Sequence, residues 1–173
     1  MLDCDTPKGK TFIQNESRVA DFLEASYGWR IAGYEKSFEG KTNHADRLIL
    51  REVNGSLQLE AIAEIKSRKT AGDKEFNLEY LKKAGTYLIT HEKLLHGQSL
   101  SRLHKVPFCV IVDLMLDSWI LSWKVTDRFG EFRFDFDAKE TKTQDTCNGG
   151  VAMRENAFLP LNFAKKILKN GNY

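Results

Sequence analysis

Two strand-like segments on either side of an Asn-Gly pair constrain the fold of this chain most strongly. Residues 46–53 and 57–66 are short runs rich in apolar residues, and Asn54 and Gly55 lie between them. Runs of this kind, bounded by turn residues, are typical of β-strands. Asn-Gly adopts the left-handed backbone that a tight hairpin turn requires. We therefore predict an antiparallel hairpin over residues 46–66.

The other segments predict helices and further strands around this hairpin. They are a helix over 13–27 that ends at Gly28, a strand over 29–34, a helix over 76–96, strands over 106–114, 119–125 and 131–137, and a short basic helix over 161–169, with loops at 38–43, 66–74 and 139–153. The dense apolar run at 106–114 suits a buried central strand. The order of these elements predicts an α/β fold with a central mixed β-sheet flanked by helices.

Length and composition indicate one soluble globular domain. The chain has 173 residues, of which 42% are hydrophobic and 29% charged, and such a chain can bury a sizeable core. No apolar run approaches the roughly 18 residues of a membrane-spanning helix, and the first residues do not resemble a secretory signal. We expect a cytoplasmic protein without a membrane partner.

Charge and cysteine usage add two limits. The formal net charge is only +2, so any surface that binds nucleic acid must be a local basic patch. Cys4, Cys109 and Cys147 are odd in number and widely spaced, which favours reduced thiols and agrees with a cytosolic compartment. Cys109 lies in an apolar run and is expected in the core.

Asp46, Glu64 and Lys66 carry the most specific chemical signal. Asp46 opens the first strand of the predicted hairpin, and Glu64 and Lys66 close the second. Two carboxylates can hold a hard cation such as Mg²⁺ through oxygen ligands. A lysine two residues after the second acid points to the same face of the strand. A metal ligand and a positive charge side by side are what metal-assisted cleavage of a phosphodiester needs.

The two acids meet only in one register of the hairpin. A three-residue loop, Asn54 to Ser56, puts Asp46 directly opposite Glu64, at a Cβ separation of about 5 Å. A two-residue Asn-Gly turn puts Asp46 opposite Ala63 and sends Glu64 to the other face, unless a β-bulge restores the alignment. The metal hypothesis therefore predicts a three-residue loop or a bulge.

In this order, these residues resemble the PD-(D/E)xK nuclease superfamily, which includes restriction endonucleases, Holliday-junction resolvases and many phage nucleases. The resemblance covers about residues 12–125 and implies a restriction-endonuclease-like αβββαβ core. Residues 126–173 would then be a C-terminal extension within a single domain, 1–173. The sequence departs from the pattern in having Ala45, and not proline, before the strand aspartate.

The resemblance implies a metal site and a catalytic lysine. Asp46 and Glu64, with the carbonyl of Ile65, would hold Mg²⁺, for which Mn²⁺ could substitute. Lys66 would orient or activate the attacking water. Glu16, on the first helix, would match the glutamate that approaches the metal in resolvase-like members.

The resemblance also assigns roles to other basic residues. Lys82, or its neighbour Lys83, would match the additional polar residue on the helix after the motif strand. Arg68, Lys69 and Lys74 follow the motif strand and, with Lys83, could contact the phosphates of DNA, which supply most sequence-independent affinity. A homodimer that cuts two strands is an arrangement common among resolvase-like members.

Each assignment has a structural alternative. The three motif residues could be a solvated strand face, Glu16 could be an acid favoured by the helix dipole, and the lysines could be solvated surface charges. The chain could also be an inactive nuclease-fold protein that binds nucleic acid or another protein, or an interaction domain. A zinc site from His44, His91 and His96 lacks a supporting cysteine pair, and Trp119 and Trp123 suit core packing. The choices between DNA and RNA, and between endonuclease and exonuclease action, remain open.

Overall fold

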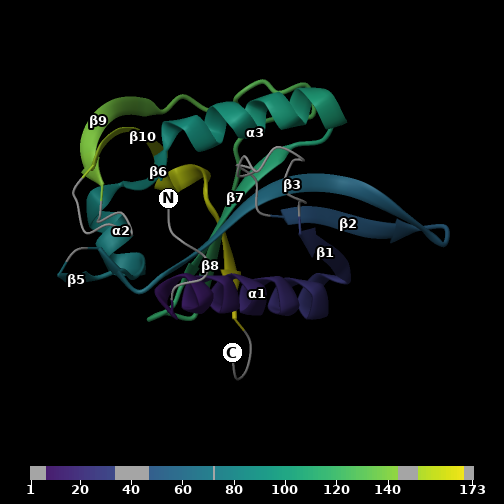
Figure 1. The fold of residues 1–173 in the computed structure, drawn as a ribbon, viewed down its shortest axis with the longest axis horizontal. Coiled ribbons are helices and arrows are strands. Elements are labelled where there is room, and N and C mark those ends of the chain that lie inside the picture. The colour runs from purple at the N-terminus through teal and green to yellow at the C-terminus, as the bar shows by residue number, and fades with distance from the viewer. Residues whose placement is uncertain (1–6, 34–46, 72, 144–151, 170–173) are drawn as a thin grey trace.

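The protein has an α/β fold in which a mixed central sheet lies between two helices. The computed structural model describes residues 7–33, 47–71, 73–143 and 152–169. Helix α1 (Pro7–Tyr27) covers one face of the central sheet and α3 (His91–His104) covers the other (Figure 1). Among the described residues, no helix is both long enough and apolar enough to cross a membrane.

The remaining elements alternate strands with one short helix. They are β1 (Trp29–Gly33), β2 (Arg47–Val53), β3 (Ser56–Arg68), β4 (Thr70–Ala71), β5 (Lys74–Glu75), α2 (Leu78–Ala84), β6 (Thr86–Thr90), β7 (Phe108–Leu114), β8 (Trp119–Lys124), β9 (Asp137–Thr143), β10 (Ala152–Pro160), a 3-10 turn (Leu161–Phe163) and β11 (Lys165–Leu168).

The central sheet has the strand order β1-β2-β3-β7-β8-β11. All neighbours in it are antiparallel except β3 and β7, which run parallel. A parallel pair needs a long crossover, and here the crossover carries β4, β5, α2, β6 and α3. A second sheet of order β6-β10-β9 and the small β4–β5 hairpin complete the described sheets. The mixed sheet predicted from the sequence is confirmed.

The β2–β3 hairpin has a two-residue turn and a bulge. Asn54 and Gly55 have φ values of 52° and 76°, and Val53 pairs with Ser56, as expected for a tight Asn-Gly turn. The predicted three-residue loop is therefore wrong. The register then shifts, because Leu50 pairs with Leu59 while Ile49 pairs with Ala61. Glu60 is the extra residue, so the predicted alternative, a bulge, is confirmed.

The helix predicted over 76–96 is two helices with a strand between them. Asn77 caps α2 through a 2.9 Å hydrogen bond from the Tyr80 amide, and Gly85 ends it in the left-handed conformation. The next five residues, TYLIT, are β-branched or aromatic at four positions, which favours a strand. They pair with β10. The leucine spacing alone did not distinguish these elements.

Four other local predictions differ from the structure. The loop expected over 66–74 contains, in its described portion, the end of β3, all of β4 and the first residue of β5. The strand expected over 131–137 is reduced to a single bridge between Thr126 and Phe132, and the strand in this region begins at Asp137. The basic helix expected over 161–169 is mainly β11, which pairs with β8 at the edge of the central sheet and buries Ile167. The loop expected over 139–153 contains parts of β9 and β10 in its described portion.

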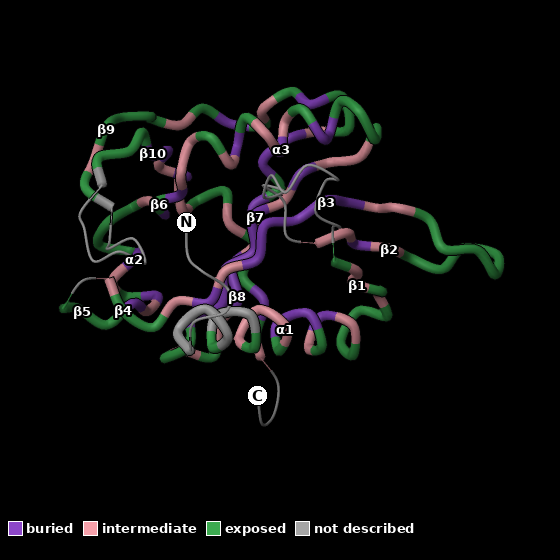
Figure 2. Tube along the Cα trace, viewed as in Figure 1, coloured by how far each residue is buried: buried purple, intermediate pink, exposed green. Residues whose placement is uncertain are grey.

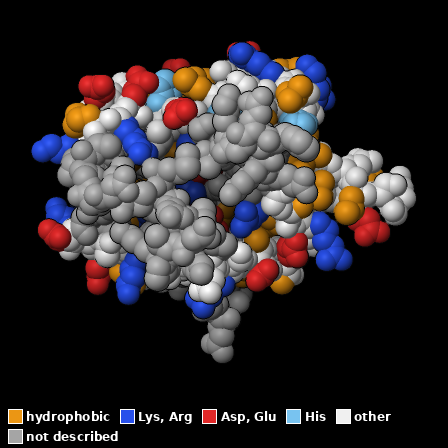
Figure 3. All heavy atoms as spheres, viewed as in Figure 1, with side chains coloured by type: hydrophobic (Ala, Val, Ile, Leu, Met, Phe, Trp, Pro, Cys, Tyr) orange, Lys and Arg blue, Asp and Glu red, His pale blue; other side chains and the backbone are white. Residues whose placement is uncertain are grey.

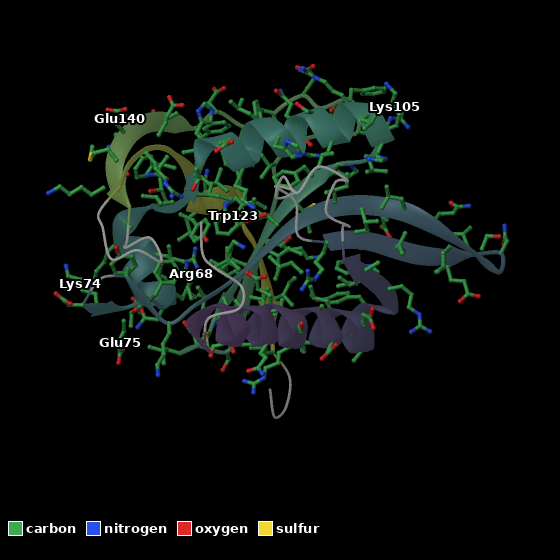
Figure 4. All side chains as sticks on the ribbon, in the orientation of Figure 1. Arg68, Lys74, Glu75, Lys105, Trp123 and Glu140 are labelled. Carbon is green, nitrogen blue, oxygen red and sulfur yellow. The ribbon has the colours of Figure 1, made fainter. Side chains whose placement is uncertain are left out.

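The core forms two apolar clusters, one on each face of the central sheet. Alternate residues of β7 serve both: Phe108, Val110 and Val112 pack on the α3 side, and Ile111 packs on the α1 side. Figure 2 shows the buried chain concentrated along β3, β7 and β8, whereas the tip of the β2–β3 hairpin is exposed. Trp123 is fully buried and donates to the Pro160 carbonyl at 2.9 Å (Figure 4). Its expected role in packing is confirmed.

Candidate active site

Glu64 and Lys66 lie on one face of β3, as strand alternation predicts. The strand pairs with β7 at these positions, Glu64 with Val110 and Lys66 with Val112. The Lys66 ammonium lies 3.0 Å from Oε1 of Glu64, and the Glu64 side chain is fully buried. A buried carboxylate is stable only with close positive charge or hydrogen bonds, and Lys66 supplies part of that charge.

Glu16 reaches the same lysine from α1. The Lys66 ammonium donates to Oε1 of Glu16 at 2.9 Å. The helix is held against the sheet by Val19 and Leu23, which are fully buried in the cluster on the α1 side. Glu16 lies one turn before Val19, so the packing of α1 brings its carboxylate to the end of β3. Glu16 therefore lies beside the motif lysine, and its approach to a metal stays a prediction.

Lys93 is the fourth member of this cluster, and the sequence analysis did not identify it. Its ammonium donates to Oε2 of Glu64 at 2.9 Å, and its side chain is 25% exposed. Lys93 lies in the first turn of α3, on the side that also carries the buried Gly97 and Leu100. Gly97 and Leu100 follow Lys93 by four and seven residues, a spacing that places all three on one side of a helix. This spacing predicts the position of Lys93 only when the helix is known to begin at His91.

Lys82 and Lys83 occupy a different place. Both lie on α2 and are exposed, and the Lys82 ammonium contacts Glu79 at 2.6 Å. The hydrogen bond from Lys82 is the main cause that lowers the pKa of Glu79. Lys82 and Lys83, which were expected to be the additional polar residue on the helix after the motif strand, therefore lie apart from the cluster, and the helix lysine that contacts Glu64 is Lys93.

The other two predicted metal ligands are Asp46 and Ile65. Asp46 lies outside the described residues, and the described β2–β3 pairing ends at Arg47 and Ala63. Ile65 lies between Glu64 and Lys66, with its side chain fully buried on the α1 side of the sheet. Only its carbonyl was expected to act as a ligand.

The basic residues assigned to nucleic acid follow β3 or lie on α2. Lys69, Lys74 and Lys83 are exposed, whereas Arg68 is half-buried and donates to the Ser67 carbonyl at 3.4 Å. Figure 4 shows Arg68 nearer the interior than Lys74, which lies at the edge of the molecule. On the described surface in Figure 3, basic and acidic side chains are interspersed. A phosphate contact by these residues would therefore involve a few basic side chains and not an extended basic surface.

The carboxylates of Glu16 and Glu64 are the candidate cation ligands among the described residues of the cluster. Glu16 and Glu64 each place an oxygen within 3.0 Å of the same Lys66 nitrogen, so the two acids converge. Carboxylate oxygens are the ligands that Mg²⁺ prefers, usually one or two from the protein with waters completing the octahedron. The described residues contain no group of three or more His, Cys, Asp or Glu side chains that could hold a metal ion, so Mg²⁺ binding here stays a prediction.

Comparison with known proteins gives no match: no protein-family model, no curated protein and no solved structure is similar to this chain.

Proposed function

We propose that this chain is a Mg²⁺-dependent nuclease of the PD-(D/E)xK type that hydrolyses phosphodiester bonds in DNA. The observation that carries the proposal is the Lys66 ammonium between two carboxylates, with Glu16 at 2.9 Å and Glu64 at 3.0 Å. An isolated surface Glu-x-Lys pair would not bury its acid completely or bring a second acid from another element. The positions of Glu16, Glu64 and Lys66 agree with the roles that the resemblance implies for them, and this agreement supports the proposal.

The strand topology also supports the proposal. A helix is followed by three antiparallel strands, then a crossover that ends in α3, then β7 parallel to β3. This is the αβββαβ order expected of a restriction-endonuclease-like core. In this assignment β4, β5, α2 and β6 form an insertion within the crossover, and β8 and β11 extend the sheet.

In the proposed metal site, Glu64 and Asp46 would be the acidic ligands, with the Ile65 carbonyl and, from α1, Glu16. Because of the bulge at Glu60, Arg47 pairs with Ala63. This is the register in which the sequence analysis expects the two strand acids to face each other. When bound, Mg²⁺ would polarise the phosphate and lower the pKa of the attacking water. Mn²⁺ would substitute for it.

Lys66 and Lys93 have different roles in this proposal. Lys66 orients the water and offsets the negative charge that develops on the phosphate. Lys93 holds Oε2 of Glu64 at 2.9 Å and so fixes the orientation of the carboxylate. The two lysines balance the charges of Glu16 and Glu64, which leaves Asp46 to provide the net negative charge that favours a divalent cation.

The test is cleavage of labelled DNA. Single-stranded, duplex, flap and four-way-junction DNAs, and a matching RNA, are incubated with Mg²⁺, Mn²⁺ or EDTA. We expect metal-dependent cutting that Lys66→Ala and Glu64→Gln abolish and that Lys82→Ala leaves intact. Lys82→Ala is the matched control, since it removes a lysine–glutamate pair outside the cluster. If no substrate is cut while DNA binding persists in EDTA, the chain is a binding protein.

A further inference from the structure

Helix α3 lies unusually close to the sheet at Gly97. A Cβ atom built on Gly97 would lie 2.4 Å from Cδ1 of Phe108 and 2.5 Å from two more ring carbons. Gly97 and Phe108 are both buried. Glycine is a poor residue for a helix interior compared with alanine. Its presence here is explained by the approach of α3 to β7, which any side chain would prevent.

Other contacts hold α3 at the same depth. The Ser101 and Thr126 hydroxyls are 2.7 Å apart, and Thr126 Oγ1 also accepts from the Phe108 amide at 2.9 Å. Gln98 donates to the Gly130 carbonyl at 2.8 Å. These bonds tie the helix to the backbone of β7 and to the turn that follows β8. The Phe108 ring is fully buried in the cluster on this face, so it has little room to move aside.

The close approach sets the reach of Lys93. Lys93 lies four residues before Gly97, one helical turn away on the same side of α3, and its ammonium contacts Glu64 at 2.9 Å. We propose that Gly97 is a positioning residue: because it lacks a side chain, α3 sits at the depth at which Lys93 holds Glu64. Any effect of Gly97 on cleavage rests on the proposed nuclease function. The effect of Gly97 on the Lys93–Glu64 contact does not depend on that function.

A single methyl group at position 97 is enough to test this. Non-bonded carbon atoms are most stable about 3.5–4.0 Å apart, so the Cβ of alanine needs at least about 1 Å more space than is present. If the helix moves outward by that amount, the 2.9 Å contact of Lys93 with Glu64 exceeds hydrogen-bonding range. A neutral packing role for Gly97 would leave that contact unchanged.

The first readout is independent of enzymatic activity. The side-chain ammonium of Lys93 is observed by NMR in ¹⁵N-lysine-labelled protein and assigned by its absence in Lys93→Met. We expect a resolved signal in the natural protein and in Ser99→Ala, a change on the exposed side of the same helix. We expect the signal to be lost or shifted to the position of solvated lysines in Gly97→Ala. An unchanged Lys93 signal in Gly97→Ala overturns the proposal.

Removal of the obstructing ring supplies the second variant pair. Gly97→Ala/Phe108→Ala is compared with Phe108→Ala alone, and both lack the ring carbons that the new Cβ would meet. We expect the two to give the same Lys93 signal. If the signal is present in Phe108→Ala but absent in the double variant, the steric explanation is wrong. This comparison can overturn the steric explanation even if Gly97→Ala alone does not fold.

Cleavage supplies the functional readout. We expect Gly97→Ala to lower the single-turnover rate about tenfold or more, which corresponds to about 1.4 kcal/mol, and to have no further effect in a Lys93→Met background. An equal loss in both backgrounds means that Gly97 acts independently of Lys93. If the natural protein cuts nothing, the nuclease proposal fails, and the NMR result still decides whether Gly97 positions Lys93.

Discussion

Two lysine–glutamate pairs, whose lysines lie on α2 and α3, allow burial and distance to be compared as predictors of stability. Lys82 lies 2.6 Å from Glu79, with side-chain exposures of 50% and 70%. Lys93 lies 2.9 Å from Glu64, with exposures of 25% and 0%. Distance alone ranks the Lys82 pair as stronger. Burial ranks the Lys93 pair as far more important, because water cannot replace the lost partner of a buried carboxylate.

The expected effects of the two substitutions on stability differ. The Lys82–Glu79 pair lies on an exposed helix surface, where water screens both charges, so we expect Lys82→Met to change the free energy of unfolding very little. Removing one partner of a buried pair costs about 3–5 kcal/mol when the other charge is left alone. Glu64 keeps Lys66 at 3.0 Å, so we expect Lys93→Met to cost less, about 1–3 kcal/mol, the range for a buried acceptor that loses one hydrogen-bond partner. For a chain of this size, this is a decrease in Tm of roughly 2–12 °C.

The assay is urea unfolding of the natural protein, Lys93→Met and Lys82→Met, followed by circular dichroism. Methionine keeps most of the apolar stem and removes only the charge. We also expect Lys93→Met/Glu64→Gln to recover much of the loss, since the neutral amide no longer needs a counter-charge. The reasoning is refuted if the two single variants agree within about 0.5 kcal/mol, or if Lys82→Met is the less stable.

Three further predictions concern the register, the surface and the core. Deletion of Glu60 removes the bulge and shifts Ala61 and later residues by one against β2; we expect loss of Mn²⁺ binding by calorimetry, whereas Glu60→Gly retains it. Lys74→Ala lowers the slope of log affinity for duplex DNA against log salt by about 0.9 if it contacts one phosphate; an unchanged slope excludes that contact. Burial raises the pKa of the Cys109 thiol from 9.0 to about 11. The folded protein therefore keeps the thiol proton between pH 9 and about 11, whereas the unfolded chain releases it above pH 9. The contribution of Cys109 to the free energy of unfolding is thus fully present below pH 9 and is lost as pH rises to about 11. The free energy of unfolding relative to Cys109→Ala, measured across that range, should fall.

The hairpin could be predicted from sequence because its determinants are local. Asn54 and Gly55 favour a tight turn between two strands, although the sequence left the loop length open at two or three residues. The alternation of β3 places Glu64 and Lys66 on one face without reference to the rest of the fold. Helix α1 was predicted for the same reason: Gly28 ends it through a 2.9 Å bond from its amide to the Glu24 carbonyl. The bulge could only be left as one of two alternatives, since nothing in the sequence near Glu60 specifies it.

Lys93 shows why the remainder of the site could not be predicted. The segment 86–90 becomes a strand because it pairs with β10, far later in the chain, and an analysis of local periodicity cannot include that partner. Once Thr86–Thr90 is a strand, α3 begins at His91, and Lys93 falls in its first turn on the side facing the sheet. If residues 76–96 formed one uninterrupted helix, as the sequence predicts, Lys82 and Lys83 would be reasonable choices for the helix lysine near the motif strand. The identity of the helix lysine at the cluster therefore depends on a non-local β-pairing, so the C-terminal strands help to determine the site even though they contribute no residue to it.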